Sequence, residues 1–319
     1  MNRVKILITG SGGFIYSNFV RYLTYEHKNK YEVIGLDKCI KSSVLNNIYY
    51  NKSNQFYIAD ICDQHVLDRI FELTRPEIVI HAAAHTFVDD SLQNPSQHML
   101  TNVVGTQNVI NSSFKFGVKK FIYISTDEVY GALNETDPSW TEESPLNPKN
   151  PYSASKASAE LAVKAAHNSF GLDYIITRCC NNYGPRQDKE KLIPKVVDAI
   201  LNDKKIPVYG LGNQIRDWLY VNDNCSALEC IIDKGELNSV YNISANQEFT
   251  NMDVISSICS TMSQGFNLIS YVEDRPGHDF RYSVDSTKLK DLGWEPSVKF
   301  KDGIKKTVNW YLANKWWFK

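Results

Sequence analysis

A glycine-rich turn after an apolar strand constrains the fold of this chain more than any other feature. Residues 4–9 (Val-Lys-Ile-Leu-Ile-Thr) resemble a strand, and residues 10–16 (Gly-Ser-Gly-Gly-Phe-Ile-Tyr) follow directly. The pattern then predicts a helix over 17–26 and a strand over 31–36, which ends at Asp37. Such a turn brings backbone N–H groups to a pyrophosphate, and an acid about 20 residues later accepts hydrogen bonds from ribose hydroxyls. The opening predicts a dinucleotide site, and Asp37 favours NAD over NADP because it disfavours a 2′-phosphate.

Short strands continue to alternate with helices over about the first 180 residues. Further strands are predicted at 56–59, 78–81 and 174–177, another begins at Phe121, and a long helix is predicted over 95–116. This alternation predicts an α/β fold with a doubly wound parallel sheet of the Rossmann type.

The second half of the chain has a less regular pattern, which predicts a smaller C-terminal α/β domain. We expect residues 1–180 to form the NAD-binding domain and residues 181–319 to form mainly a substrate-binding domain. A segment near 217–243 is expected to return to the first domain. The basic and aromatic side chains of the second half suit a phosphorylated substrate.

Polar residues end the strand that begins at Phe121. Ser125, Thr126, Asp127 and Glu128 follow its apolar and aromatic residues. In an open parallel sheet, ligands bind at the carboxyl ends of the strands. Two carboxylates in one cleft have pKa values that are pushed apart, so one can remain protonated while the other acts as a base. We therefore expect chemistry at this strand end.

Tyr152 and Lys156 are four residues apart in a run of small residues and good helix formers. That spacing places both side chains on one face of a helix. A tyrosine beside an ammonium group loses its proton more easily, which suits proton removal from an alcohol. The pair is a candidate acid–base element.

Composition excludes several classes of function. The net charge is −1, so nucleic acid and anionic membrane surfaces are not expected partners. No apolar run reaches the ~18 residues of a membrane span, and the N-terminus does not resemble a signal peptide. The seven cysteines lack Cys-x-x-Cys spacing and are expected to be reduced thiols in the cytoplasm. There is no His-Glu-x-x-His motif, so no metal site is predicted.

Three motifs together resemble the nucleoside-diphosphate-glucose 4,6-dehydratases of the extended short-chain dehydrogenase/reductase family. They are Thr9-Gly10-x-x-Gly13-Phe14-Ile15, Ser125-Thr126-Asp127-Glu128-Val129-Tyr130-Gly131 and Tyr152-x-x-x-Lys156. Further similar segments are 181–185, 190–194, 216–220 and 274–279, so the resemblance covers about residues 5–317. Thr126-Asp127-Glu128 is its most specific part, because related sugar-nucleotide epimerases usually lack the acid pair.

The resemblance implies an NAD-dependent lyase that converts dTDP-glucose or UDP-glucose to the 4-keto-6-deoxyglucose nucleotide and water. In that family chemistry Tyr152 removes the 4-hydroxyl proton, Lys156 lowers the pKa of Tyr152, and Thr126 binds the same sugar oxygen. Glu128 removes the C5 proton, and Asp127 protonates the departing 6-hydroxyl. Adjacent side chains in a straight strand face opposite ways, so a bend is predicted at Asp127. A step in rhamnose-type deoxysugar biosynthesis is the expected role.

The resemblance also implies which side chains contact each ligand, and it implies a homodimer in which helices near 95–116 and 152–170 pair. NAD is expected to contact Gly10, Gly13, Phe14, Ile15, Asp37, Asp60, Ile61, Ala83, Thr101, Tyr152, Lys156 and Asn182. The sugar nucleotide is expected to contact Thr86, Thr126, Asn181, Lys191, Tyr209, Arg216, Asn251, Arg275 and His278. Arg216 and Arg275 suit a diphosphate because a guanidinium binds oxygens in a forked geometry.

The chain departs from the family pattern at two places. Tyr16 replaces the third glycine of the first turn, where helix and strand pack closely. A tyrosine fits there only if its ring points away or the helix shifts, and we expect the fold to adapt and activity to survive. Residues 85–90 also differ from common bacterial members.

Three questions stay open at this stage. Thymine and uracil differ by one methyl group, worth about 1–3 kcal/mol of discrimination, and no residue decides between dTDP and UDP. A sugar-nucleotide 4-epimerase or decarboxylase on the same scaffold is the alternative enzyme. A protein that binds NAD or a sugar nucleotide without turnover is the alternative of a different class, and Tyr16 is the residue that keeps it open.

Overall fold

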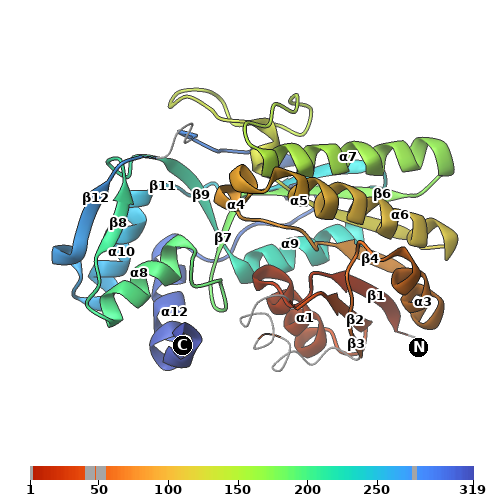
Figure 1. Ribbon diagram of the computed structural model, residues 1–319, viewed down its shortest axis with the longest axis horizontal. Coiled ribbons are helices and arrows are strands. Elements are labelled where there is room, and N and C mark those ends of the chain that lie inside the picture. Colours follow the sequence, from red (N-terminus) through yellow and green to blue (C-terminus); the bar gives the residue numbers. More distant parts are fainter. Residues whose placement is uncertain (1–2, 40–46, 48–54, 275–278) are drawn as a thin grey trace.

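A seven-stranded parallel sheet forms the centre of the larger part of the molecule (Figure 1). The structure is a computed structural model that describes residues 3–39, 47, 55–274 and 279–319. The strand order is β10-β6-β5-β4-β1-β2-β3. The strands are β1 (Val4–Thr9), β2 (Tyr31–Asp37), β3 (Gln55–Ile58), β4 (Ile78–His81), β5 (Lys120–Thr126), β6 (Tyr174–Cys179) and β10 (Ser239–Ile243). The prediction of a doubly wound α/β sheet is confirmed.

Helices cover both faces of the sheet because its strands alternate apolar side chains between two cores. Ile6 and Ile8 point into one core, whereas Leu7 points into the other. The first core is closed by α1 (Phe14–Glu26) and α9 (Val221–Lys234). The second core is closed by α3 (Gln64–Thr74), α6 (Gly105–Lys115) and α7 (Pro151–Phe170). Figure 1 shows α1 on the opposite side of the sheet from α6 and α7.

The predicted helix over 95–116 is helical but not uniform. It consists of α5 (Pro95–Met99), a π-helical turn η1 (Leu100–Val104) and α6. A further short helix, α4 (Val88–Gln93), precedes it and was not predicted. A π-helical turn inserts an extra residue, so it shifts the side chains that follow around the helix axis.

The C-terminal region has its own apolar core, which lies beside the carboxyl ends of the large sheet. Ile193, Val208, Ile258 and Val308 belong to this core. Figure 1 shows α8, α10, α12, β8 and β12 gathered at one end of the molecule. The helices are α8 (Leu192–Leu201), α10 (Asn251–Met262), α12 (Phe300–Ala313), η3 (Phe266–Leu268) and η4 (Lys315–Phe318). α11 (Thr287–Asp291) packs instead on β10, and its Leu289 lies in the same core as Ile6. The strands are β7 (Asn181–Tyr183), β8 (Ile206–Tyr209), β9 (Ile215–Tyr220), β11 (Glu248–Thr250) and β12 (Ile269–Val272).

Although β10 and α9 come late in the chain, they pack with the large sheet. β10 pairs in parallel with β6, and Leu228 and Ile231 of α9 lie in the same core as Ile6. Among the helices that the structure describes, none combines the length and the apolar composition needed to cross a membrane.

Candidate active site

The chain bends sharply where β5 ends. A 3₁₀-helical turn, η2 (Asp127–Tyr130), follows Thr126 directly, which confirms the predicted bend. The Thr126 hydroxyl accepts a hydrogen bond from the Glu128 N–H at 3.3 Å and caps this turn. The turn ends at Gly131, which has φ 88°, and an ideal Cβ there would lie 2.6 Å from the Asn147 carbonyl oxygen. Only glycine fits that position, so the local sequence fixes how the two acids are presented.

Burial gives Asp127 an unusual affinity for its proton. The side chain is 3% exposed, and Oδ1 accepts a hydrogen bond from the Thr126 hydroxyl at 3.1 Å. Oδ2 has no hydrogen-bond partner within the described chain. Burial, and next the Glu128 carboxylate, raise the pKa of Asp127 to about 8. Asp127 is therefore mostly protonated at neutral pH.

Glu128 lies beside Asp127 but has more contact with neighbouring polar groups. Burial raises its pKa, while a hydrogen bond from the Asn150 amide at 3.4 Å opposes the rise. Arg216 and Lys191 also lower it. Two adjacent carboxyl groups in different surroundings can act as an acid and a base.

Tyr152 and Lys156 lie on the first turns of α7, as the spacing predicts. Asn150 caps this helix by accepting a hydrogen bond from the Ser153 N–H at 2.8 Å. The Lys156 ammonium donates to the Ile124 carbonyl at 2.5 Å. Burial lowers the pKa of Lys156 to about 8. The helix start therefore packs both side chains against the end of β5.

The pKa of Tyr152 is raised, which is opposite to the expectation that Lys156 lowers it. Burial is the largest cause, followed by Glu128, Cys179 and Asp127, whereas the Thr126 hydroxyl lowers the pKa. The Lys156 ammonium is bound to the Ile124 carbonyl, and it lies 4.4 Å from the centre of the Tyr123 ring. Because the cation is occupied there, burial and next the nearby acids determine the proton affinity of Tyr152.

The glycine-rich turn has the close backbone approach that a dinucleotide site requires. Gly10 has φ 71°, and an ideal Cβ there would lie 2.8 Å from the Ala83 nitrogen. Asp37 accepts hydrogen bonds from the N–H groups of Gly12 at 3.0 Å and Cys39 at 2.9 Å. These contacts fix the acid beside the turn. Gly13 precedes α1, whose first residues are Phe14 and Ile15.

The other expected NAD contacts lie along the same sheet edge. Asp60 accepts a hydrogen bond from the Cys62 N–H at 3.0 Å and pairs with Lys38. Burial raises the pKa of Asp60, but the contacts with Lys38 and Cys62 together outweigh burial, so the pKa is lowered. Ile61 is buried, and Thr101 lies in the π-helical turn.

Asn182, on β7, carries a further sign that the site accepts a ligand. Its amide donates to the Cys180 carbonyl at 3.0 Å. Its Oδ1 atom is buried and has no hydrogen-bond partner in the described part of the chain. A buried acceptor without a donor is costly, so a donor on a bound ligand would satisfy it. The close approach of the backbone at Gly10 and this buried acceptor fit NAD.

Tyr16 is accommodated inside the core rather than turned toward solvent. Its side chain is 6% exposed and packs in the same apolar cluster as Ile8 and Phe19. Burial raises its pKa, and Cys179, Cys225 and Tyr152 also contribute. The ring therefore extends from α1 toward the end of β6, near the candidate catalytic residues.

One expected substrate residue, Lys191, lies near the acids. The Lys191 ammonium lies 4.2 Å from the centre of the Phe87 ring, which follows Thr86. Lys191 also influences the proton affinity of Glu128. Thr86 and Asn181 are exposed. The structure thus brings the segment after β4, the start of α8 and η2 together.

Arg216 has a different environment from the expected diphosphate ligand. Its guanidinium donates to the carbonyl oxygens of Ile215 at 2.7 Å, Asp279 at 2.9 Å and Phe280 at 3.1 Å. It also lies 4.3 Å from the Tyr282 ring. These bonds occupy much of its donor capacity, so Arg216 positions the 279–282 segment next to the acids.

The remaining expected substrate contacts lie farther along the C-terminal region. Asn251 donates to the Gln214 side chain at 3.4 Å, and Gly212 donates to the Tyr209 carbonyl at 3.0 Å. These hydrogen bonds place both residues around the 209–214 turn. Arg275 and His278 lie outside the described residues.

Sequence reasoning missed the buried ion pair that supports η2. Arg178 donates to Glu160 at 2.6 Å and to the Tyr130 hydroxyl at 2.6 Å. Both charged side chains are almost fully buried. An arginine inside an otherwise apolar strand was the available signal, because a buried charge requires a partner. The role of Asn150 was signalled by its position before Pro151, which is typical of a helix start.

Comparisons with known proteins agree over nearly the whole chain. A family model described as GDP-mannose 4,6 dehydratase matches residues 7–307. A dTDP-glucose 4,6-dehydratase from Neisseria meningitidis is 41% identical over 98% of this chain and 95% of that protein. The crystal structure of DesIV, a dTDP-glucose 4,6-dehydratase from Streptomyces venezuelae with NAD bound, matches with TM-score 0.92 and 38% identity, covering 98% of both chains. A UDP-glucose 4-epimerase from Thermotoga maritima has TM-score 0.90 and 32% identity, covering 98% of this chain and 100% of that one.

Proposed function

The chain belongs to the family described as GDP-mannose 4,6 dehydratase, and we propose that it is an NAD-dependent hydro-lyase acting on dTDP-glucose or UDP-glucose. The products are the 4-keto-6-deoxyglucose nucleotide and water. One observation carries the proposal: Asp127 and Glu128 occupy one turn beside Tyr152, and Asp127 keeps its proton at neutral pH. Elimination of water needs such an acid next to a base, whereas epimerisation at C4 does not.

Each side chain has a distinct task in the proposed reaction. Bound NAD supplies reversible hydride exchange with the sugar. Tyr152 removes the proton of the 4-hydroxyl, and the neighbouring Thr126 hydroxyl holds that oxygen. A ketone at C4 makes the C5 proton acidic, so Glu128 can remove it. Asp127 then gives its proton to the departing 6-hydroxyl, which leaves as water. The hydride taken from C4 would return from the cofactor to C6 while a proton returns to C5, which completes the 4-keto-6-deoxy sugar.

The surroundings of the acids favour this division of roles. Asp127 is buried, and its pKa of about 8 keeps it in the acid form that a leaving hydroxyl needs. Burial raises the pKa of Glu128 too, but the Asn150 amide, Arg216 and Lys191 oppose that rise and favour its charged form.

Product mass tests the proposal directly. The purified full-length protein is incubated with dTDP-glucose and, separately, with UDP-glucose, first without and then with added NAD. We expect loss of one water from at least one substrate, and the faster substrate identifies the nucleotide. An isomer of unchanged mass would instead indicate an epimerase. No turnover under either condition would favour a binding protein without catalysis.

A homodimer in the cytoplasm is part of the same proposal. Exposed apolar side chains gather on two neighbouring stretches, α5 to α6 and α7, and they include Leu100, Val104 and Leu161. Such a patch is typical of a protein interface. All seven cysteines are free thiols, which fits a reducing compartment.

Light scattering after size exclusion tests the dimer. We expect twice the chain mass for the wild type and the mass of one chain for Leu161→Glu, because a charge would be buried in the interface. Leu73→Glu, which replaces an exposed leucine on α3, is the matched control and should remain dimeric. A wild type with the mass of one chain would contradict this part of the proposal.

A further inference from the structure

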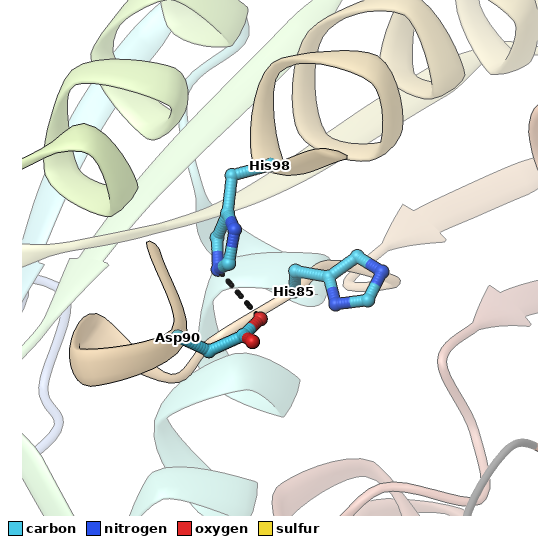
Figure 2. A group of neighbouring side chains, drawn as sticks. All are labelled: His85, Asp90 and His98. Carbon is cyan, nitrogen blue, oxygen red and sulfur yellow. Dashed lines mark ion pairs between the residues drawn. The ribbon is translucent and has the colours of Figure 1, made fainter. Parts of the chain in front are cut away.

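Two histidines and an aspartate form a compact group next to the candidate active site. His85 lies in the connection after β4, Asp90 lies in α4 and His98 lies in α5. The nitrogen and oxygen atoms that they could offer to an ion all lie within 4.8 Å of one another. Figure 2 shows the three side chains converging from these separate segments.

His98 has a buried ring nitrogen, Nε2, without a hydrogen-bond partner among the described residues. Its side chain is fully buried, and Nδ1 lies 3.2 Å from the Asn94 carbonyl oxygen. A carbonyl only accepts hydrogen bonds, so Nδ1 donates to it and Nε2 is the nitrogen left to face a ligand. Nε2 is buried without a hydrogen-bond partner in the described chain, and the Asp90 carboxylate lies 3.9 Å from it.

We propose that His85, Asp90 and His98 bind one divalent transition-metal ion, with Zn²⁺ as the ion that suits them best. Two imidazoles and one carboxylate are a ligand set that zinc uses when water fills its fourth position. In metal-bound histidines, the ring nitrogen that does not bind the metal typically donates to a backbone carbonyl or a carboxylate, which fixes the ring orientation. The Nδ1 atom of His98 makes this contact with the Asn94 carbonyl. A hard ion such as Mg²⁺ prefers oxygen ligands instead.

The geometry allows the ligands to close around an ion. Zinc bonds of about 2.0–2.1 Å in a tetrahedral site place ligand atoms about 3.3 Å apart. The 3.9 Å separation of Asp90 and His98 therefore has to shorten by roughly half an ångström. The Asp90 side chain is 46% exposed, so it has room to rotate toward the buried imidazole, and the hydrogen bond that its Oδ1 accepts from the Asn94 amide at 3.1 Å would adjust.

The third ligand is already held in place by its backbone. Asn102 accepts a hydrogen bond from the His85 N–H at 2.8 Å and donates to the His85 carbonyl at 3.0 Å. The same amide donates to the Ser155 hydroxyl of α7 at 2.8 Å. A metal here would join the segment after β4 to α5, and through Asn102 to the helix that carries Tyr152 and Lys156. The site is thus a structural support for that wall of the active site.

Zinc titration followed by calorimetry tests the proposal, and its readout does not depend on turnover. The full-length protein is stripped with a chelator, dialysed and titrated with ZnCl₂. We expect one ion per chain, at least tenfold weaker binding in Asp90→Asn, and a similar loss in His85→Ala. Asp89→Asn is the matched control, because it removes the same charge from the neighbouring residue of α4 and should bind zinc like the wild type.

The absorption of cobalt, used in place of zinc, identifies the ligands. We expect the visible bands of a nitrogen- and oxygen-bound ion, and their loss in Asp90→Asn. Strong thiolate bands would place the ion on cysteines and would overturn the proposal. Absence of saturable binding in the wild type, or equal affinity in the Asp89 and Asp90 variants, would overturn it as well. Both variants change partly exposed or surface groups, so a failure to fold does not obscure the result.

Discussion

The acid pair (Asp127 and Glu128) and the histidine cluster (His85, Asp90 and His98) follow adjacent strands of one sheet but are built in opposite ways. The acids are neighbours in sequence on a single turn, and a neighbouring threonine caps that turn. The histidine cluster is assembled from three separate segments that meet only in the folded chain. One site is therefore encoded locally, and the other depends on packing.

The two groups also differ in what burial has done to them. Burial next to a second carboxylate has raised the pKa of Asp127 to about 8, which creates an acid that works at neutral pH. In the cluster, burial has left His98 Nε2 without a hydrogen-bond partner in the part of the chain that the structure describes. The first arrangement favours proton transfer, and the second favours a cation.

The largest expected effect is the fall in turnover when Asp127 is replaced by a residue that cannot act as an acid. Asp127→Asn should lower kcat by about 10²- to 10⁴-fold because the departing hydroxyl is no longer protonated. Sugar-nucleotide affinity should change little, since Asn has nearly the same shape. In the wild type, kcat should fall as pH rises through about 8. Steady-state kinetics measure turnover, and equilibrium binding measures the affinity for the sugar nucleotide. Asp89→Asn, which replaces an aspartate of α4 next to the histidine cluster, is the control and should keep the turnover of the wild type. Unchanged turnover in Asp127→Asn would refute the acid role.

The next prediction concerns the buried Arg178–Glu160 ion pair, which supports the turn that carries the acids. Glu160→Gln leaves the buried Arg178 without its charged partner, so we expect a loss of about 3–5 kcal/mol in the free energy of unfolding. Urea denaturation measures it. The exposed Arg69–Glu72 pair provides the control, because Glu72→Gln should cost about 1 kcal/mol or less. Equal losses in the two variants would contradict the buried role of the Glu160 pair.

The sequence predicted those features that depend on neighbouring residues. The glycine-rich turn, the bend at Asp127 and the shared helix face of Tyr152 and Lys156 all follow from spacing within a few residues. The direction of the Lys156 ammonium toward Ile124 could not be predicted from spacing, because the packing of α7 against β5 decides it.

Long-range contacts account for the rest. The π-helical turn at 100–104 and the short helix α4 bring His98 close to His85, and no local pattern indicates either. Arg216 was assigned to a diphosphate from its chemistry, and the structure adds a contact that the chemistry did not indicate, because the chain near Phe280 returns and accepts hydrogen bonds from the guanidinium. A His-Glu-x-x-His motif places its metal ligands on one helix. Its absence therefore does not indicate whether three separate segments supply a group of ligands.

The pH dependence of the free energy of unfolding should reveal the raised pKa of Asp127. The pKa of Asp127 is about 8 in the folded chain and near 3.8 in the unfolded chain. Between these values the unfolded chain binds fewer protons, so stability falls as pH rises. At about 1.4 kcal/mol per pKa unit the effect is on the order of a few kcal/mol. Thermal unfolding at pH 5 and pH 8 should show a larger decrease in Tm for the wild type than for Asp127→Asn. Parallel profiles would contradict the raised pKa.

The smallest expected effect is that of Tyr16→Phe, at a ring that lies near Tyr152 in the core between α1 and the sheet. Tyr16→Phe keeps the ring and removes only the hydroxyl, so NAD retention should not change and stability should change by about 1 kcal/mol. Tyr16→Gly restores the usual glycine but removes a buried ring, which should cost about 3–5 kcal/mol. NAD released from each purified, denatured protein is measured by absorbance. If the wild type binds no NAD and the glycine variant does, then the tyrosine blocks the cofactor, and the acid pair beside it has lost the partner that its chemistry requires.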